Sequence, residues 1–246
     1  MNSLRLTGRR VPRTCSRAAW LLSSWLCGVT LAQNPPDLNG VWQLSSPVPA
    51  LMKTADGQEP ALNEHAQAIY SQHRAAYQAG DRSFDAAANG CGDPGMPRIM
   101  MMSDRFEIVQ DADRVVTLFA RGNRFRVVEL KRSLDPVDLF YFGNPNGHWD
   151  HSELVVESSD FRESSFIDAA GMPHSDAMTL TERYRLSKGG KELIDQITVS
   201  DPKTFKTPWT VIMRYRKLPS HTELLPADQQ VNCAPPTPKG SSQGGG

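Results

Sequence analysis

Residues 176–186 read DAMTLTERYRL, a stretch in which the side chains alternate in polarity. Such alternation has the two-residue period of a β-strand with one buried and one solvated face. The even positions form the more apolar face, and they are Asp176, Met178, Leu180, Glu182, Tyr184 and Leu186. We therefore expect this strand to carry two carboxyl groups and a phenol into the protein interior.

Similar strand patterns occupy most of the chain. Segments rich in β-branched and aromatic residues, each bounded by Asp, Asn, Gly or Pro, occur at 37–46, 106–110, 114–120, 124–130, 138–142, 153–159, 191–200 and 209–218. The short turns between them predict antiparallel hairpins in meander order. Because closure removes unpaired edges, we expect an all-β, mainly antiparallel, closed or nearly closed barrel of about eight or nine strands.

One segment has the period of a helix instead. Residues 62–79 place apolar side chains three and four positions apart, with Asn63 suited to cap the start and Gly80 to end the helix. A single helix does not organise a domain of this size. We expect an α-helical insertion that flanks the barrel.

The first 32 residues have the pattern of a secretory signal peptide. Five arginines and no acidic residue accompany the apolar run AWLLSSWLCGVTLA, which ends at Ala32. This run of about 14 residues is shorter than the ~20 that a membrane-spanning helix needs. We therefore expect a periplasmic protein without a membrane anchor, cleaved near Ala32, with one barrel domain over 33–233 and a disordered tail over 234–246.

Cleavage would change the charge and the cysteine balance. The chain has 27 basic and 27 acidic residues, and losing five arginines gives a mature net charge of about −5, which disfavours nucleic acid as a partner. Of the four cysteines, Cys91 and Cys233 would remain. In an oxidising compartment two such cysteines are expected to form a disulfide, the alternative being two buried free thiols.

Several motifs together resemble a large family of exported bacterial proteins, mostly of unassigned function. They are DLNGVW (37–42), CGDPGMPRIMM (91–101), FEIVQDADRV (106–115), GHWDHSELVVESSDF (147–161), FIDAAGMPHSDAMTLTERYRL (166–186) and DPKTFKTPWT (201–210). Members come from bacteria that degrade aromatic, terpenoid or steroid-like compounds, so the resemblance implies a hydrophobic small molecule.

Two positions refine this resemblance. The spacing of Gly40 and Trp42 is similar to the opening strand of lipocalins, in which the Trp packs against a late arginine, here Arg214 or Arg216. His151 stands where the family hairpin usually has glycine. Because a side chain is disfavoured at positive φ, either the turn has changed type or His148 and His151 belong to a site at the barrel mouth.

The adjacent His174, Ser175 and Asp176 do not fit a hydrolase triad, because consecutive side chains in an extended segment point to opposite sides. His174 remains a candidate general acid or base, oriented by Asp176 or Asp168. The structural interpretation is a polar turn that satisfies its own amides.

Glu182 also has two interpretations. It is either a catalytic carboxyl or a buried hydrogen-bond partner of Arg98, Arg124 or Tyr184. The methionines near residue 100 are typical of adaptable pocket lining, with Cu(I) binding as the alternative. No phosphate-binding or dinucleotide-binding motif occurs, so we expect no nucleotide cofactor.

The sequence-based hypothesis is a cofactor-independent lyase, isomerase or hydrolase acting on a hydrophobic, aromatic or polycyclic molecule inside a lipocalin-like barrel. The catalytic candidates are His174, Asp176, Glu182 and Tyr184. The substrate-binding candidates are His148, His151, Tyr141, Arg98, Arg124, Trp149 and Met100. The first alternative is a binding protein without chemistry, and the second is a metal-dependent enzyme using His148, His151 and His174. A homo-oligomer is compatible with each of these.

Overall fold

A computed structural model describes residues 34–88, 92–131, 138–187 and 189–225 of the chain. The expected signal peptide, Cys91, Cys233 and the tail from residue 234 lie outside these residues. Their predictions therefore remain predictions. No helix among the described residues is long and apolar enough to cross a membrane.

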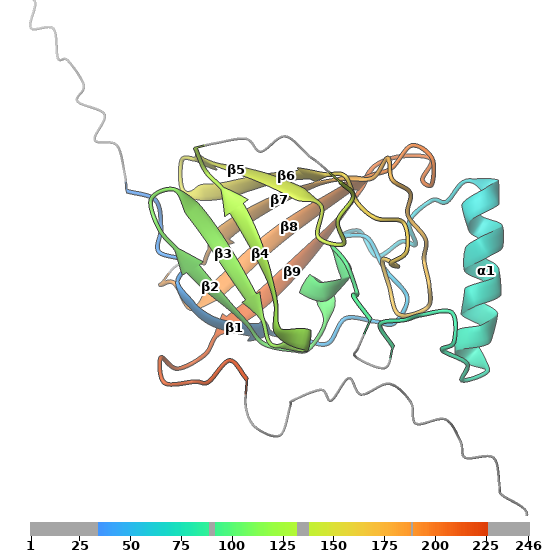
Figure 1. Cartoon of the computed structure of the whole chain (residues 1–246), viewed down its shortest axis with the longest axis horizontal. Coiled ribbons are helices and arrows are strands. Elements are labelled where there is room, and N and C mark those ends of the chain that lie inside the picture. Colours follow the sequence, from blue (N-terminus) through green and yellow to red (C-terminus); the bar gives the residue numbers. More distant parts are fainter. Residues whose placement is uncertain (1–33, 89–91, 132–137, 188, 226–246) are drawn as a thin grey trace, which may run out of the picture. The chain divides into compact units, whose positions relative to one another are not determined.

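Nine strands close into a barrel in the order of the chain (Figure 1). They are β1 (Gly40–Leu44), β2 (Phe106–Gln110), β3 (Arg114–Phe119), β4 (Arg124–Glu129), β5 (Asn144–Asp150), β6 (Glu153–Ser159), β7 (Thr179–Leu186), β8 (Glu192–Ser200) and β9 (Trp209–Lys217). Most of these segments were marked by strand patterns in the sequence. The expected all-β, lipocalin-like barrel is confirmed.

Neighbouring strands pair antiparallel, with one exception. β4 and β5 pair in parallel, through Glu129 and Asn146. A parallel pair needs a crossover of about a dozen residues rather than a hairpin turn, and residues 130–143 supply that length. The barrel closes where β1 pairs with β9, so that Trp42 lies opposite Lys217.

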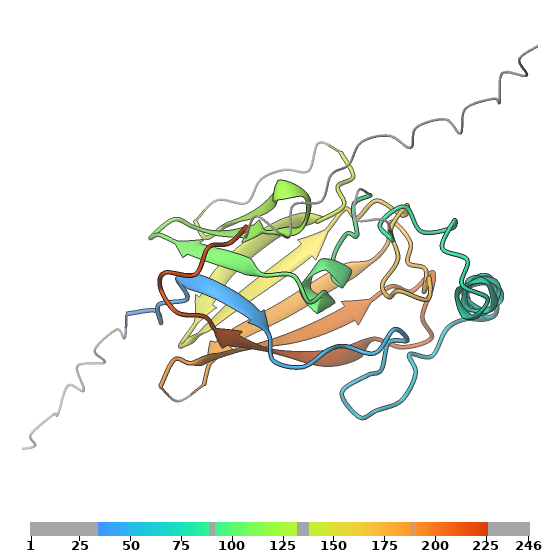
Figure 2. The ribbon, with the colours of Figure 1, turned by 90° about the horizontal axis from the view of Figure 1, so that it is seen from below.

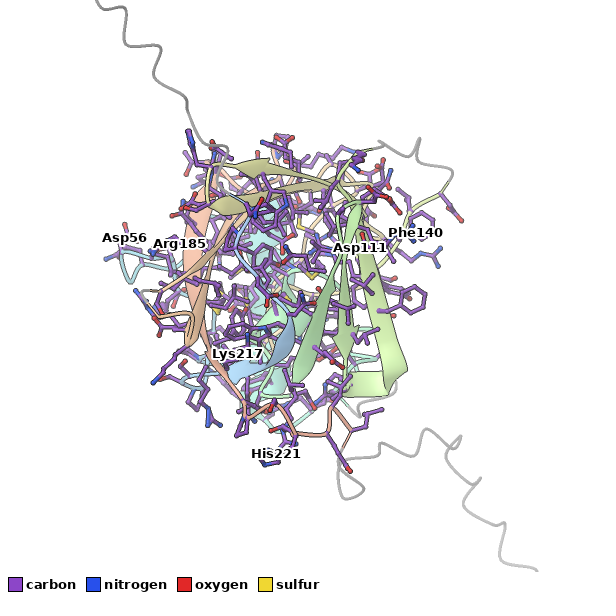
Figure 3. All side chains as sticks on the ribbon, turned by 90° about the vertical axis from the view of Figure 1, so that its left-hand side faces the viewer. Asp56, Asp111, Phe140, Arg185, Lys217 and His221 are labelled. Atoms are coloured by element: carbon purple, nitrogen blue, oxygen red, sulfur yellow. The ribbon has the colours of Figure 1, made fainter. Side chains whose placement is uncertain are left out.

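The predicted strand at 138–142 is wrong. Phe140 forms only a single bridge with Phe161, and its side chain is 48% exposed at the periphery of the molecule (Figure 3). The strand forms later, as β5, although its first residues, NPNG, have low strand propensity. Pairing with β6 along the whole length of β5 outweighs that local preference.

The expected flanking helix is confirmed as α1 (Glu64–Gln78), which lies beside one end of the barrel (Figures 1 and 2). Asn63 caps it, its Oδ1 accepting from the amide of Ala66 at 2.8 Å. The helix buries Tyr70, whose hydroxyl donates to Asp168 Oδ2 at 2.8 Å. That carboxylate also accepts from three backbone amides, so it fastens the helix to the loops around it.

Trp42 is fully buried at the barrel wall, with its Nε1 donating to the Leu38 carbonyl at 3.0 Å. The cation near its ring is Lys217, whose Nζ lies 5.2 Å from the ring centroid. Arg214 and Arg216 are exposed on the outer face of β9. The prediction that one of these arginines packs on Trp42 is wrong, because strand alternation turns both away from the barrel.

Candidate functional site

The alternation on β7 places its side chains as the sequence predicted. Leu180, Glu182 and Tyr184 are buried inside the barrel. Arg185 lies on the opposite face, at the outside of the molecule (Figure 3). The strand therefore does carry a carboxyl group and a phenol into an apolar interior.

Asp176, in contrast, does not point into the barrel. β7 begins only at Thr179, and Asp176 lies in the preceding turn with its side chain 45% exposed. Its carboxylate forms an ion pair with Lys203 at 2.6 Å. The prediction failed because the alternating sequence pattern begins at Asp176, three residues before the strand itself begins at Thr179.

Glu182 is held by an arginine that the sequence analysis did not single out. Arg126 on β4 donates from Nη1 to Oε1 at 3.0 Å and from Nη2 to Oε2 at 2.5 Å. The same Nη2 donates to Ser158 Oγ at 2.7 Å, and the hydroxyl of Tyr184 donates to Glu182 Oε1. The expected partners Arg98 and Arg124 are engaged elsewhere, whereas the expected partner Tyr184 is confirmed.

Asp195 on β8 completes this group inside the barrel. It lies directly opposite Tyr184 in the β7–β8 pair, and it is 0% exposed. Neither of its carboxyl oxygens has a hydrogen-bond partner, and Arg126 Nε also lacks one. We refer to Arg126, Ser158, Glu182, Tyr184 and Asp195 as the barrel cluster.

Burial controls the protonation of the barrel cluster. Burial, together with the nearby charge of Glu182, raises the pKa of Asp195 well above its usual value. Arg126 partly offsets the shift, as does the Tyr184 hydroxyl, which lies close to this carboxyl although it donates its hydrogen to Glu182. Burial also raises the pKa of Tyr184. Burial lowers the pKa of Arg126, but the attraction of the Glu182 carboxylate outweighs this effect and raises the Arg126 pKa. Burial therefore favours the protonated form of Asp195 beside the Arg126–Glu182 ion pair.

His174 lies in a separate polar group within the loop before β7. It is 5% exposed, and its Nε2 is 2.9 Å from Ser165 Oγ. Its Nδ1 is 3.1 Å from the Ser175 carbonyl. Asp168, proposed to orient it, instead binds Tyr70 and backbone amides. The structure thus divides the predicted catalytic residues between the barrel interior and this loop.

The three substrate-binding candidates near β4 and the 91–101 motif have structural partners. Arg98 forms a buried bidentate ion pair with Asp85, at 2.9 and 2.7 Å. Arg124 Nε donates to Asp93 Oδ2 at 2.9 Å. Met100 is buried in a short 3-10 helix, η1 (Arg98–Met101), where its carbonyl accepts from the Tyr215 hydroxyl at 2.9 Å.

The remaining binding candidates lie on or near the β5–β6 hairpin. His148 is exposed on β5, and His151 occupies the turn with its side chain 96% exposed. Trp149 is partly buried against the core. Tyr141 is also partly buried, and its hydroxyl accepts from Ser164 Oγ at 3.3 Å. The structure does not bring these four side chains into the barrel cluster.

His151 keeps a left-handed backbone, with φ of 55°. The turn therefore has the backbone conformation that favours glycine, although a histidine occupies it. The described residues contain no group of three or more His, Cys, Asp or Glu side chains that could hold a metal ion. His148 and His151 face solvent while His174 is buried, so this arrangement does not support the metal-dependent alternative.

Three surface hollows are lined by described residues away from the barrel cluster. The first, of about 250 Å³, lies between residues 44–49 and the middle of β9. The second, of about 360 Å³, lies between residues 54–61 and 207–210. The third, of about 100 Å³, is lined in part by Arg98, Met101 and Asp168. None of the three is lined by a member of the barrel cluster.

The sequence analysis missed Arg126 and Asp195, although a signal for both was present. Asp195 alternates with the apolar Leu193 and Ile197 on β8, as Arg126 does with Val128 on β4. A charged residue among apolar neighbours on one strand face indicates an inward position. No family model and no curated protein sequence matches the chain.

Proposed function

We propose that the protein is a periplasmic, cofactor-independent enzyme that holds a small apolar molecule inside the barrel and acts on it by proton transfer. Asp195 is the acid, and it donates its proton to a single oxygen atom of that molecule. The observation that carries this proposal is the fully buried carboxyl of Asp195, whose pKa is raised by burial and whose two oxygens accept no hydrogen bond. The signal-peptide pattern of residues 1–32 supports the location.

The energetics of Asp195 favour a function over a structural role. A buried polar group without a partner costs about 1–3 kcal/mol of stability. A ligand oxygen that accepts a hydrogen bond from the carboxyl would offset this cost. Arg126 Nε, a donor of the barrel cluster that is buried without a partner, suits the same kind of acceptor. A carbonyl oxygen fits these donors, whereas a carboxylate would be repelled by Glu182.

Entry of such a molecule requires the interior to repack. Met100, Met178 and Met213 belong to the buried hydrophobic core. Methionine side chains have three rotatable bonds and adapt to irregular shapes. The proposal requires these side chains to move and make space for an apolar ring.

The cluster also supplies a route for the proton. Asp195 gives its proton to the substrate oxygen, and Tyr184, opposite it in the β7–β8 pair, donates its hydroxyl hydrogen to Glu182. Proton transfer of this kind serves lyases, isomerases and hydrolases alike. A carboxyl with a raised pKa is suited to act as the acid near neutral pH.

A matched set of ligands tests the proposal. We expect 2-acetylnaphthalene to bind about tenfold more tightly than naphthalene, which corresponds to one hydrogen bond, and 2-naphthoate to bind most weakly. Asp195→Leu should remove the preference for the ketone, whereas Asp113→Asn on the surface should keep it. Calorimetry measures the affinities. Failure of all three compounds to bind would contradict the proposal.

A second candidate function is a carrier that performs no chemistry. It is favoured by one observation: Arg126 engages both carboxylate oxygens of Glu182, so this carboxylate is poorly placed to act as a base. Mass spectrometry of a ligand retained from the periplasm distinguishes the two. An unchanged ligand after hours of incubation indicates a carrier, and a product indicates an enzyme.

A further inference from the structure

Ser165 and His174 form a second polar pair, in the loop between β6 and β7. Their side chains are 2.9 Å apart, from Ser165 Oγ to His174 Nε2, and both residues are buried. They are nine positions apart in the chain. The pair is separate from the barrel cluster, and it is independent of the function proposed for that cluster.

The hydrogen bonds of His174 determine which of its nitrogens carries the proton. Its Nδ1 lies 3.1 Å from the carbonyl oxygen of Ser175, which can only accept. Nδ1 therefore carries the hydrogen, and Nε2 of the neutral ring keeps its lone pair. It follows that the Ser165 hydroxyl donates to Nε2, which is the direction needed for a serine nucleophile and its base.

The Asp201 carboxylate positions the His174 ring through Ser175. Asp201 accepts from the backbone amide and from the hydroxyl of Ser175, each at 2.7 Å. These two bonds hold the Ser175 carbonyl that orients His174. The base is thus oriented by a third group, as it is in nucleophile and base pairs of serine enzymes.

The backbone approaches the Ser165 hydroxyl closely on one side. Gly95 has φ of +68°, and a Cβ atom added there would collide with Ser165 Oγ and lie 2.9 Å from its Cβ. Only glycine allows the backbone at position 95 to pack this closely against the Ser165 hydroxyl. The neighbouring Ser164 is exposed, and its hydroxyl bonds to Tyr141. Ser165 itself is buried, one position along the chain from this exposed residue.

We propose that Ser165 is a nucleophile and His174 its general base, acting on small carboxylic esters. Ser165 Oγ attacks the ester carbon while its proton passes to His174 Nε2. The carbon–oxygen bond to the alcohol then breaks, and the alcohol leaves with that proton. Water releases the acyl group by the reverse proton path, giving the carboxylic acid and restoring the Ser165 hydroxyl.

Diisopropyl fluorophosphate tests the nucleophile directly. Ser165 Oγ forms a bond to phosphorus, the phosphorus–fluorine bond breaks, fluoride leaves, and the proton passes to His174. We expect one adduct per chain, mapped to Ser165 by peptide mass spectrometry. Release of p-nitrophenol from p-nitrophenyl acetate provides the second measurement.

Three variants separate a nucleophile from a structural serine. Ser165→Ala should lose both the adduct and ester cleavage, whereas Ser164→Ala, at the exposed neighbour, should keep both. His174→Gln should slow labelling about 100-fold, as expected on removing a general base. Far-UV circular dichroism confirms that each variant is folded. An adduct at another residue, no adduct, or equal labelling of His174→Gln would overturn the proposal.

The dependence of labelling on pH gives a readout that a structural role would not produce. Burial lowers the pKa of His174, although the Ser175 carbonyl and Asp201 partly oppose this shift. The base therefore stays neutral to a lower pH than an ordinary histidine, whose pKa is about 6.5. As the pH is lowered, we expect the labelling rate to stay constant down to pH 6.5 and to fall only below that value. A labelling rate that does not fall at any pH below 6.5 would contradict the role of His174.

Discussion

Arg126 on β4 and Glu182 on β7 are 56 residues apart in the chain, yet they meet in the barrel interior through two parallel hydrogen bonds. Each residue removes the cost of burying the other. The pair therefore joins strands that are not neighbours in the sheet, and its removal should affect the whole barrel.

Arg126→Met should destabilise the protein by about 3–5 kcal/mol, because it leaves Glu182 buried without its partner. The double variant Arg126→Met/Glu182→Leu should recover most of that loss, since no buried charge remains. Urea unfolding followed by tryptophan fluorescence measures both effects. Arg185→Met, on the outer face of β7, serves as the control and should change little. An Arg126→Met variant as stable as the wild type would contradict the buried pairing.

Asp195 should make stability depend on pH in a specific direction. Its pKa in the folded protein is raised by burial, so the folded state retains a proton that the unfolded state loses above about pH 3.9. The free energy of unfolding should therefore fall as pH rises from that value toward the folded pKa, by at most about 1.4 kcal/mol per pH unit. Asp195→Asn should lack this component. If the free energies of unfolding of the wild type and Asp195→Asn change in parallel between pH 4 and 8, Asp195 does not contribute to the pH dependence of stability.

His151→Gly should stabilise the β5–β6 hairpin. The residue has φ of 55°, where glycine avoids the steric cost that a side chain incurs, and we expect a gain of about 0.5–1 kcal/mol. Ser152→Gly is the matched control, because its φ is not positive and the substitution there should destabilise. Thermal unfolding measures both. The opposite order of stabilities would show that the His151 side chain has a stabilising contact in solution.

The anchor of α1 is a fourth test. Tyr70→Phe removes one hydrogen bond to Asp168 and should cost about 1 kcal/mol. Asp168→Ala should cost more, because Met52 N, Ala170 N and Met172 N lose their acceptor as well. Hydrogen exchange should show faster exchange in α1 and at the Met52 amide. Unchanged protection of α1 in Asp168→Ala would contradict its role as the anchor.

The two cysteines of the predicted mature chain give a fifth prediction. After export, the intact mass should correspond to a chain that begins at Gln33. Cys91 and Cys233 should resist alkylation in urea until a reductant is added. The unprocessed protein from the cytoplasm, where thiols stay reduced, is the comparison. Alkylation of both thiols in the exported protein without reductant would rule out the disulfide.

The sequence predicted local features of this protein better than the partners of its side chains. Glu182 and Tyr184 were placed correctly because the two-residue period of a strand is a local property. The pairing of Glu182 with Arg126 depends on barrel closure, which no local pattern reports. Asp176 was misplaced because alternation does not locate the start of a strand.

Loops and pairing-dependent strands were the least predictable. Ser165 lies in a loop without periodicity, so nothing in the sequence connects it with His174. The apolar segment 138–142 had the composition of a strand but remained outside the sheet, whereas β5 formed from weak strand formers beside β6. Long-range pairing decided both outcomes.

The pairing of β1 with β9 has a consequence for how the barrel forms. Trp42 and Lys217 come from opposite ends of the described chain, so this seam joins only after β9 has been synthesised. Contacts between such distant segments form slowly. Until then, water reaches Arg126, Glu182 and Asp195, and the Asp195 carboxyl is free to ionise. Closure of this seam should therefore exclude water from the interior, and the resulting burial raises the pKa of Asp195.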